Sequence, residues 1–144
     1  MKCTTIIDKE RSEEVVIYLQ KDAPIAQRIR EICEESSAEL VGYDGGIVML
    51  QANEIYCFTL DYGKLYAYTS DKRVLLKQRL YEIEQSLDDS FVKINQSCII
   101  NISRIKRFDT SLGGSLMVTL KNGYKDYISR RQLKTVKERI GFKL

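Results

Sequence analysis

The side chains most able to do chemistry in this chain are cationic, and they gather in its last third. Residues 91–144 contain twelve lysines and arginines but only three acidic residues, whereas residues 1–90 contain eleven basic and seventeen acidic residues. The two parts therefore carry formal charges of +9 and −6, although the whole chain carries +3. Concentrated positive charge attracts a polyanion, because cations that neutralise phosphates release the counterions condensed on nucleic acid. The charge pattern indicates nucleic acid as the first candidate partner, with a solvated lysine-rich surface as the alternative.

The chain has no histidine, which removes much enzyme chemistry. Without an imidazole there is no Ser–His or Cys–His couple and no usual catalytic zinc set. Paired acidic residues such as Asp88 and Asp89 are sequence neighbours, which is typical of a solvated surface and not of a general acid and base. The four cysteines form no CxxC pair. We therefore expect no catalytic residue, no metal ligand and no cofactor, and a lysine- or metal-dependent nuclease is the remaining enzymatic alternative.

The length of 144 residues fits one domain, or one domain with a small attached element. No apolar stretch approaches the roughly 20 residues that cross a bilayer, and the N-terminus lacks the pattern of a signal peptide. These features predict a cytoplasmic protein, and nothing in the composition suggests a small-molecule substrate.

Residues 1–38 are expected to form a small ββα element. Runs rich in β-branched residues at 3–7 and 15–19 are separated by polar turn residues, which predicts a hairpin. Apolar residues then recur at helical spacing from Ile25 to Ile32, so a helix with one apolar face follows.

Residues 39–144 have the pattern of a second, mostly antiparallel β domain. Apolar runs of four to six residues alternate with turn residues at close intervals, and a short helix is expected near residues 80–87. Asn122-Gly123 predicts a tight hairpin, because both residues accept a positive φ. Ser129 and Gln132 form a capping-box pattern at the start of a last helix. The predicted fold class is therefore α+β, mostly antiparallel β with short helices.

Three segments of the second domain together resemble the LytTR-type DNA-binding domain. They are residues 47–55, the run Phe91-Val92-Lys93-Ile94-Asn95-Gln96-Ser97-Cys98-Ile99-Ile100-Asn101, and the stretch from Leu120-Lys121-Asn122-Gly123 to Ile128-Ser129-Arg130-Arg131. The likeness spans about residues 40–142 and depends on all of these motifs occurring at the right separations. The resemblance implies an output module of bacterial response regulators, with an elongated antiparallel β fold that reads successive major grooves of duplex DNA through loops.

The same resemblance implies a set of DNA-contacting residues. They are Lys64, Lys93, Asn95, Gln96, Ser97, Arg130, Arg131 and Lys134. Amides suit adenine and arginine suits guanine, so the triplet 95–97 and Arg131 are the expected base readers. The lysines and Arg130 are expected at phosphates, with a guanine edge as a second option for Lys64.

Each of these residues also has a structural interpretation. Lys64 can be a solvated turn residue, and the amides of Asn95 and Gln96 can bond local backbone groups. The two arginines can pair with Asp126 or Glu138.

The sequence departs from the family pattern in two ways. Many relatives have histidine where Asn95 stands, so the base preference is expected to differ. The usual receiver domain is absent, because the 40 residues ahead of the LytTR-like part are too few for a phosphoacceptor α/β domain. Stand-alone members of this kind imply, in some cases, a membrane protein that restrains the regulator. One small domain offers few base contacts, so we also expect a second copy of the chain, with residues 1–38 serving self-association or binding a sensing partner.

The hypothesis is thus a sequence-specific regulator that binds double-stranded DNA as a homodimer on repeated half-sites. One rival is an RNA or single-strand binder that would stack bases on exposed tyrosines such as Tyr62, Tyr66, Tyr68 or Tyr124. The other is a protein-interaction module in which the acidic part of one copy docks on the basic part of another.

Overall fold

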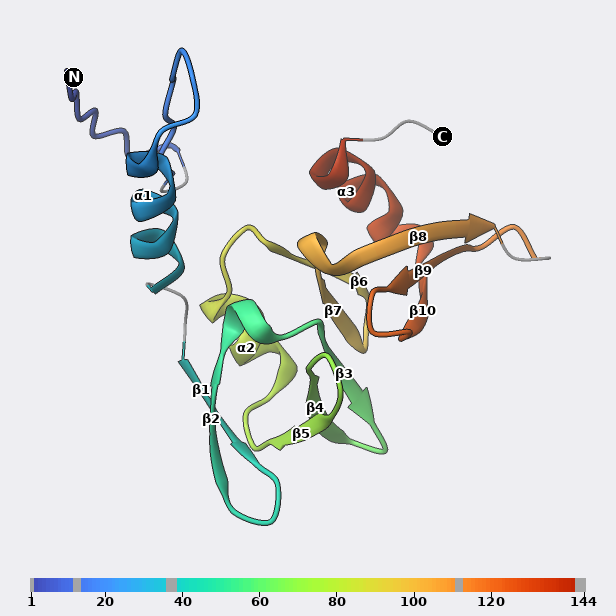
Figure 1. The fold of residues 1–144 in the computed structure, drawn as a ribbon. Coiled ribbons are helices and arrows are strands. Elements are labelled where there is room, and N and C mark those ends of the chain that lie inside the picture. The colour runs from blue at the N-terminus through green and yellow to red at the C-terminus, as the bar shows by residue number, and fades with distance from the viewer. Residues whose placement is uncertain (1, 12–13, 36–38, 111–112, 142–144) are drawn as a thin grey trace. The chain divides into compact units, whose positions relative to one another are not determined.

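The computed structural model describes residues 2–11, 14–35, 39–110 and 113–141 and divides into two compact units. We call Met1–Glu35 the N-terminal unit and Ser36–Leu144 the C-terminal unit. The N-terminal unit is drawn in blue in Figure 1 and contains one helix, α1, at Pro24–Glu35. Proline suits the first helical position because its fixed φ matches the helix and its missing N–H would have no partner there.

The two strands expected at residues 3–7 and 15–19 do not form, and this prediction was wrong. Both segments lack any strand assignment in the part of the chain that the structure describes. A two-stranded hairpin is marginal by itself, because it needs a third strand or a packed helix to bury its apolar face. The large apolar side chains of these segments are accordingly exposed: Ile6, Ile7, Val15, Val16, Tyr18 and Leu19.

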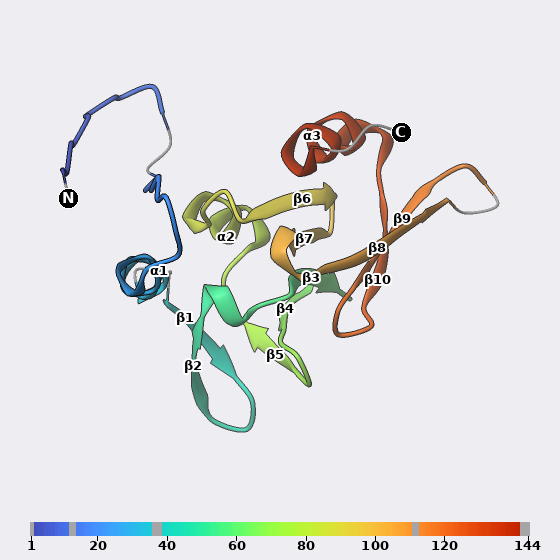
Figure 2. The same cartoon turned by 45° about the horizontal axis from the view of Figure 1, so that its top comes forward.

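The described residues of the C-terminal unit form two antiparallel sheets, two α-helices and two short 3₁₀ helices, Ala52–Glu54 and Ile102–Arg104 (Figure 2). The first sheet has the strand order β2-β1-β5-β4-β3-β7-β6, and the second has the order β10-β9-β8. The strands are β1 Glu39–Tyr43, β2 Ile47–Gln51, β3 Cys57–Asp61, β4 Lys64–Tyr68, β5 Arg73–Leu76, β6 Phe91–Asn95, β7 Cys98–Asn101, β8 Ile105–Thr110, β9 Leu116–Leu120 and β10 Lys125–Ile128. The helices are α2 Leu80–Ser86 and α3 Arg130–Ile140. The prediction of a mostly antiparallel α+β fold is confirmed.

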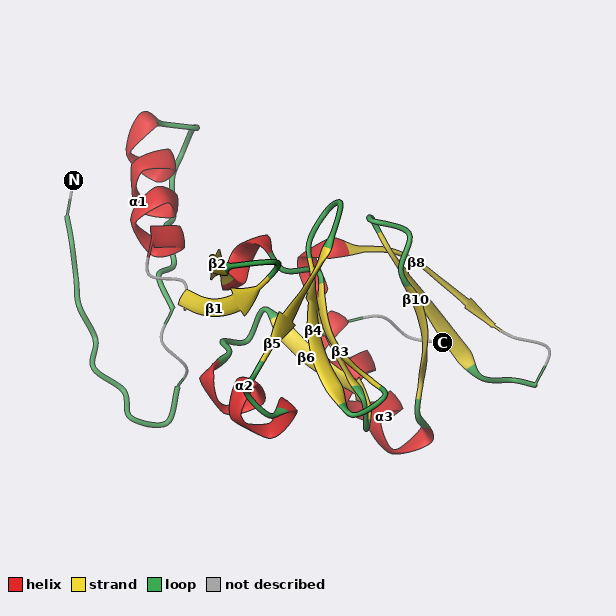
Figure 3. Ribbon diagram, turned by 90° about the horizontal axis from the view of Figure 1, so that it is seen from below, coloured by secondary structure: helices red, strands yellow, loops and turns green. Residues whose placement is uncertain are grey.

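Two hydrophobic clusters hold the C-terminal unit together. The first lies under β1 to β5 and α2 and includes the fully buried Phe58, whose ring centroid is 5.7 Å from that of Phe91. The second joins β6 and β7 to the smaller sheet and to α3 through Val136. Figure 3 shows β3, β4 and β5 side by side, with α2 and α3 beneath them. Gly42 on β1 is required by this packing, because a Cβ there would collide with Val74.

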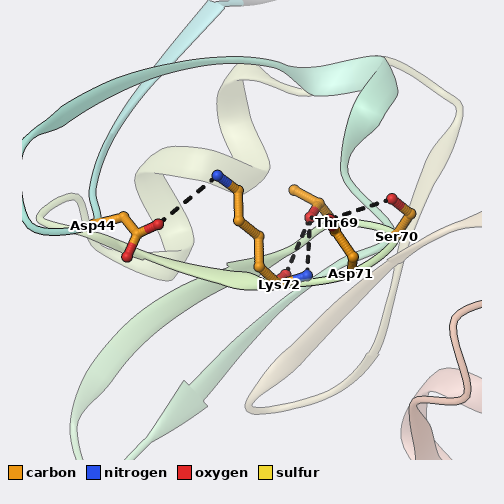
Figure 4. Close-up of polar contacts among 5 residues, drawn as sticks. All are labelled: Asp44, Thr69, Ser70, Asp71 and Lys72. Carbon is orange, nitrogen blue, oxygen red and sulfur yellow. Dashed lines mark hydrogen bonds and ion pairs between the residues drawn. The ribbon is translucent and has the colours of Figure 1, made fainter.

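Polar contacts fix the end of the sheet where β4 turns into β5. Thr69 Oγ1 lies 3.2 Å from the carbonyl oxygen of Lys72, and Lys72 Nζ lies 3.8 Å from an Asp44 carboxylate oxygen (Figure 4). Asn122 Nδ2 donates to the Thr69 carbonyl at 3.0 Å. The turn between β9 and β10 is therefore tied to the turn between β4 and β5.

The turn at Asn122-Gly123 differs from the tight hairpin that its sequence predicts. Only Gly123 has a positive φ, of 91°, and the side chain of Asn122 accepts from the backbone N–H of Tyr124 at 3.1 Å. The three residues Lys121-Asn122-Gly123 thus form a longer loop with glycine in the left-handed position. The hairpin was predicted correctly, but Asn122 does not take the positive φ that its sequence allows.

Candidate nucleic-acid interface

Three loops meet at the end of the sheet opposite to the contacts in Figure 4. The backbone N–H of Leu60 donates to the Ser97 carbonyl at 2.8 Å, which places the 61–64 turn beside the turn between β6 and β7. The backbone N–H of Ser129 donates to the Ile94 carbonyl at 2.8 Å, which places the start of α3 beside the same turn. We call residues 61–64, 95–97 and 129–131 the loop edge. It brings together the three places where DNA contacts were predicted.

The buried side chain of Asn95 holds two parts of the loop edge together through hydrogen bonds. Its side chain is 3% exposed, Nδ2 donates to the Tyr127 carbonyl at 2.9 Å, and Oδ1 accepts from the Ser97 backbone N–H at 2.9 Å. Both ends of the amide are therefore occupied inside the protein. A buried amide that bonds backbone on two elements fixes their relative position.

Most of the other predicted contact residues face outward. Gln96 and Ser97 at the tip of the turn are exposed, as are Lys64, Arg130, Arg131 and Lys134. Neither Arg130 nor Arg131 pairs with Asp126 or Glu138 among the ion pairs found within the described residues. Lys93 is different, because its ammonium lies 3.7 Å from Glu84 and its side chain is only 29% exposed.

The positive charge of residues 91–144 is only partly free. Besides Lys93, four cations there contact protein groups: Arg104, Arg107, Lys121 and Arg139. Arg139, for example, donates to the Phe91 carbonyl at 3.0 Å and ties the end of α3 to the start of β6. The exposed cations without such a contact within the described ranges include Arg130, Arg131 and Lys134, all on α3. Lys106 on β8 and Lys125 on β10 are exposed in the same way, so the free positive charge lies on α3, which begins at the loop edge, and on the smaller sheet.

The start of α3 matches the predicted position but not the predicted cap. Ser129 directly precedes the helix, yet its side chain makes no capping hydrogen bond. Its backbone carbonyl instead accepts from the N–H groups of Gln132 and Leu133 at 3.1 and 3.0 Å. The helix ends at Gly141, whose φ of 78° is the left-handed conformation that glycine adopts readily.

A polar pocket of about 320 Å³ opens behind the loop edge, with Asp61, Ser97, Asp126 and Tyr127 in its wall. The Tyr124 hydroxyl donates to Asp126 Oδ2 at 2.9 Å and lies 3.2 Å from Thr59 Oγ1. Burial raises the pKa of this hydroxyl far above its ordinary value, and the neighbouring Cys98 adds to the effect. The tyrosine therefore stays protonated and holds the Asp126 carboxylate within the pocket wall.

Sequence reasoning gave Tyr62 no role in binding duplex DNA. This residue stands at the tip of the 61–64 turn with a φ of 48°, and its side chain is 100% exposed. A bulky residue at a position that needs a positive φ was the available signal, since turns of this kind favour Asn, Asp or Gly.

The LytTr DNA-binding domain family matches residues 45–141 of this chain. The chain belongs to that family. An uncharacterized HTH-type transcriptional regulator of Staphylococcus aureus strain NCTC 8325 is 35% identical to it over 107 residues, which cover 74% of this chain and 73% of the relative. A corresponding protein of the bovine strain RF122 is 34% identical over the same length.

A solved LytTr structure has the same fold as the C-terminal unit. It is the LytTr DNA-binding domain of a putative methyl-accepting/DNA response regulator from Bacillus cereus, which matches with a TM-score of 0.68 and 19% identity. The match covers 74% of this chain and 100% of that domain. The recognition of a LytTR domain from sequence is thus confirmed, and the chain carries a DNA-binding domain.

The structure adds two observations on other kinds of site. Across the part of the chain that the structure describes, no three Cys, Asp or Glu side chains gather as metal ligands would. None of the described helices combines the length and the apolar character needed to cross a bilayer.

Proposed function

We propose that this protein is a sequence-specific transcription regulator that reads double-stranded DNA with its loop edge. The single observation that carries this proposal is the meeting of three outward-facing polar loops at one end of a rigid sheet, held by backbone bonds of 2.8 Å. Binding residues are best placed on loops that a rigid scaffold holds in register. Family membership supports DNA as the partner of the domain, and we assign this partner to the loop edge.

Within this surface, Arg131 and Gln96 are the proposed base readers. Both are exposed, and their side chains offer the paired donors or the amide that recognise guanine and adenine edges in the major groove. Lys64, Arg130 and Lys134 are proposed at phosphates, where a cation adds affinity without sequence preference. The N-terminus of α3 favours a nearby phosphate through its free backbone N–H groups.

Three predicted residues receive modified roles in this proposal. Asn95 positions Gln96 and Ser97 through its buried amide and does not itself contact a base. Ser97 uses its backbone in this geometry, so only its hydroxyl remains for DNA. Lys93 is paired with Glu84, so we propose that it adds to the positive electrostatic potential near the loop edge and makes no direct phosphate contact.

The N-terminal unit is proposed to join two copies on repeated half-sites. Its only buried residue among those described is Ala26, and Ile25 and Ile32 on α1 are 40% and 65% exposed. An element of this size cannot bury its apolar side chains alone, and association with a second copy would do so. Pairing of modules also raises affinity through effective concentration. A regulatory membrane protein is the alternative occupant of this unit.

Single-strand or RNA binding has less support. That mode needs several free aromatic rings along a groove. The Tyr66 ring lies under the Arg73 guanidinium at 4.4 Å, and the Tyr68 and Tyr124 rings contact each other at 5.1 Å between centroids. Of the four tyrosines considered, Tyr62 alone is wholly exposed.

The direct test is selection of bound oligonucleotides from a random duplex pool with the full chain. We expect a two-part motif whose halves are about one helical turn, roughly 10 base pairs, apart. On the selected site, Arg131→Ala should cost about 1–3 kcal/mol of binding free energy and relax base preference at one position.

Lys121→Ala is the matched control, because it removes the same charge at the opposite end of the sheet. It should bind nearly as the parent does. The proposal fails if no duplex is enriched, and the base-reading role of Arg131 fails if its loss weakens all sequences equally.

A further inference from the structure

The backbone of Tyr62 adopts a conformation that a tyrosine disfavours. Tyr62 and Gly63 are the two central residues of the turn that joins Asp61 to Lys64, with φ values of 48° and 76°. Two positive φ values define a type I′ turn, which fits the twist of a hairpin but favours Asn, Asp or Gly. Tyr62 is the only residue other than glycine with a positive φ within the described ranges. The turn itself does not explain why a bulky side chain stands there.

A second hairpin of the same unit makes the contrast clear. The pair with ideal turn chemistry, Asn122-Gly123, lies at the other end of the sheet, and Asn122 keeps an ordinary φ there. Its side chain bonds Tyr124 and Thr69, so that residue serves the structure. Tyr62 serves no contact of this kind, because its side chain is 100% exposed. A strained backbone at a residue whose side chain contacts nothing within the protein indicates that the side chain serves to bind a ligand.

The position of Tyr62 indicates which ligand this is. Its turn lies in the loop edge, where Leu60 donates to Ser97 at 2.8 Å, and Tyr62 is two residues from Lys64. A wholly exposed ring on a surface that binds DNA has apolar area to bury, and the sugar walls of the groove and thymine methyl groups offer apolar partners. A ring bound in this way leaves the base pairs stacked.

On the basis of the proposed function, we propose that Tyr62 is a DNA-contacting residue whose ring packs against deoxyribose or a thymine methyl group of the duplex. This contact is apolar, so it adds affinity that does not depend on counterion release. Lys64 in the same turn supplies the ionic part. The turn thus carries two contributions that differ in their dependence on salt.

The test compares Tyr62→Gly with Tyr81→Ala on the selected duplex, by fluorescence anisotropy at several salt concentrations. Glycine removes the ring and suits the positive φ, so the melting temperature should stay within roughly 2 °C of the parent. The affinity should fall by roughly tenfold with an unchanged salt slope. Tyr81 is 56% exposed on α2 and does not belong to the loop edge, so its loss should leave the affinity unchanged.

Lys64→Ala provides the opposite signature, because loss of one phosphate contact should reduce the salt slope by about 0.9. The inference on Tyr62 is overturned if Tyr62→Gly binds the duplex as tightly as the parent and Tyr81→Ala do. It is also overturned if Tyr62→Gly weakens binding to single strands alone. Failure of the parent to bind any duplex would instead remove the proposed function, so the two failures are distinct.

Discussion

The N-terminal and C-terminal units use similar apolar residues with opposite results. In the C-terminal unit, β-branched and aromatic side chains fill two clusters, and Ile55, Phe58, Ile94 and Ile100 are fully buried. Among the described residues of the N-terminal unit, eight large apolar side chains are exposed, and they include Ile7 at 90% and Tyr18 at 93%. The contrast teaches that a strand-like sequence becomes a strand only where neighbouring elements can cover it. It also shows that the described part of the N-terminal unit leaves its large apolar side chains uncovered.

The strongest test of this difference between the two units is to remove one aromatic ring from the core of the C-terminal unit. Phe58→Ala should lower the free energy of unfolding by about 3–5 kcal/mol, because it leaves a cavity at a fully buried site. Urea unfolding would measure the loss. Ile7→Ala in the N-terminal unit is the counterpart and should change the free energy by less than about 0.5 kcal/mol. A similar cost for both variants would mean that the N-terminal unit has a core of its own.

A second prediction separates the structural role of Asn95 in the loop edge from the DNA-contacting role proposed for Gln96. Asn95→Ala leaves the Tyr127 carbonyl and the Ser97 N–H without their partner, so it should destabilise the C-terminal unit by about 1–3 kcal/mol. Gln96→Ala, at the exposed tip of the same turn, should change stability by less than about 0.5 kcal/mol while weakening DNA binding. Thermal unfolding and anisotropy, measured on both variants, decide the matter. Equal stability of the two variants would contradict the positioning role of Asn95.

A third prediction concerns the exposed face of α1. Ile32→Glu should weaken self-association by at least about 1.5 kcal/mol, because a buried isoleucine would be replaced by a charge in each copy. Sedimentation equilibrium of the full chain would measure the change. Gln27→Glu is the matched control, since it adds the same charge on the opposite face of the helix. If both variants associate as the parent does, this face does not join the two copies.

The smallest expected effect is a loss of stability at high pH. The pKa of Tyr124 is raised in the folded protein above its ordinary value of 10.0, so above that pH the unfolded chain loses a proton that the folded protein keeps. Stability should therefore be full below about pH 10 and fall as the pH rises further, by less than about 1.4 kcal/mol per pH unit because the group is partly exposed. Tyr124→Phe should flatten this fall in urea unfolding measured at about pH 9 and 11. An unchanged slope would show that other groups, such as the buried Cys98, dominate.

Much of the C-terminal unit could be predicted from the sequence, for identifiable reasons. Its strands are short apolar runs bounded by turn residues, and that pattern predicted a mostly antiparallel β domain over residues 39–144. The start of the last helix was located by the capping-box pattern of Ser129 and Gln132. The motifs from Phe91 to Arg131 located two of the three loops that meet at the loop edge, the 95–97 turn and the start of α3.

The failures have a common physical cause, because each depended on contacts between residues distant in sequence. The residues next to Asn95 in the sequence do not indicate that its amide donates a hydrogen bond to the carbonyl of Tyr127, which is 32 residues away. Asn122 leaves the predicted tight turn because its side chain reaches Thr69, which lies 53 residues back. The segments at 3–7 and 15–19 have strand propensity but no strand to pair with in the described chain.

The sequence by itself determined the family, the fold class and the half of the chain that carries positive charge, because composition, periodicity and motif spacing are local properties. Only the tertiary structure decided which polar groups form hydrogen bonds inside the protein and which face the solvent. Asn95 and Gln96 are chain neighbours of the same chemical kind, yet one is buried and bonded and the other is exposed. Burial depends on which distant elements pack over a residue, and a one-dimensional pattern does not contain that information.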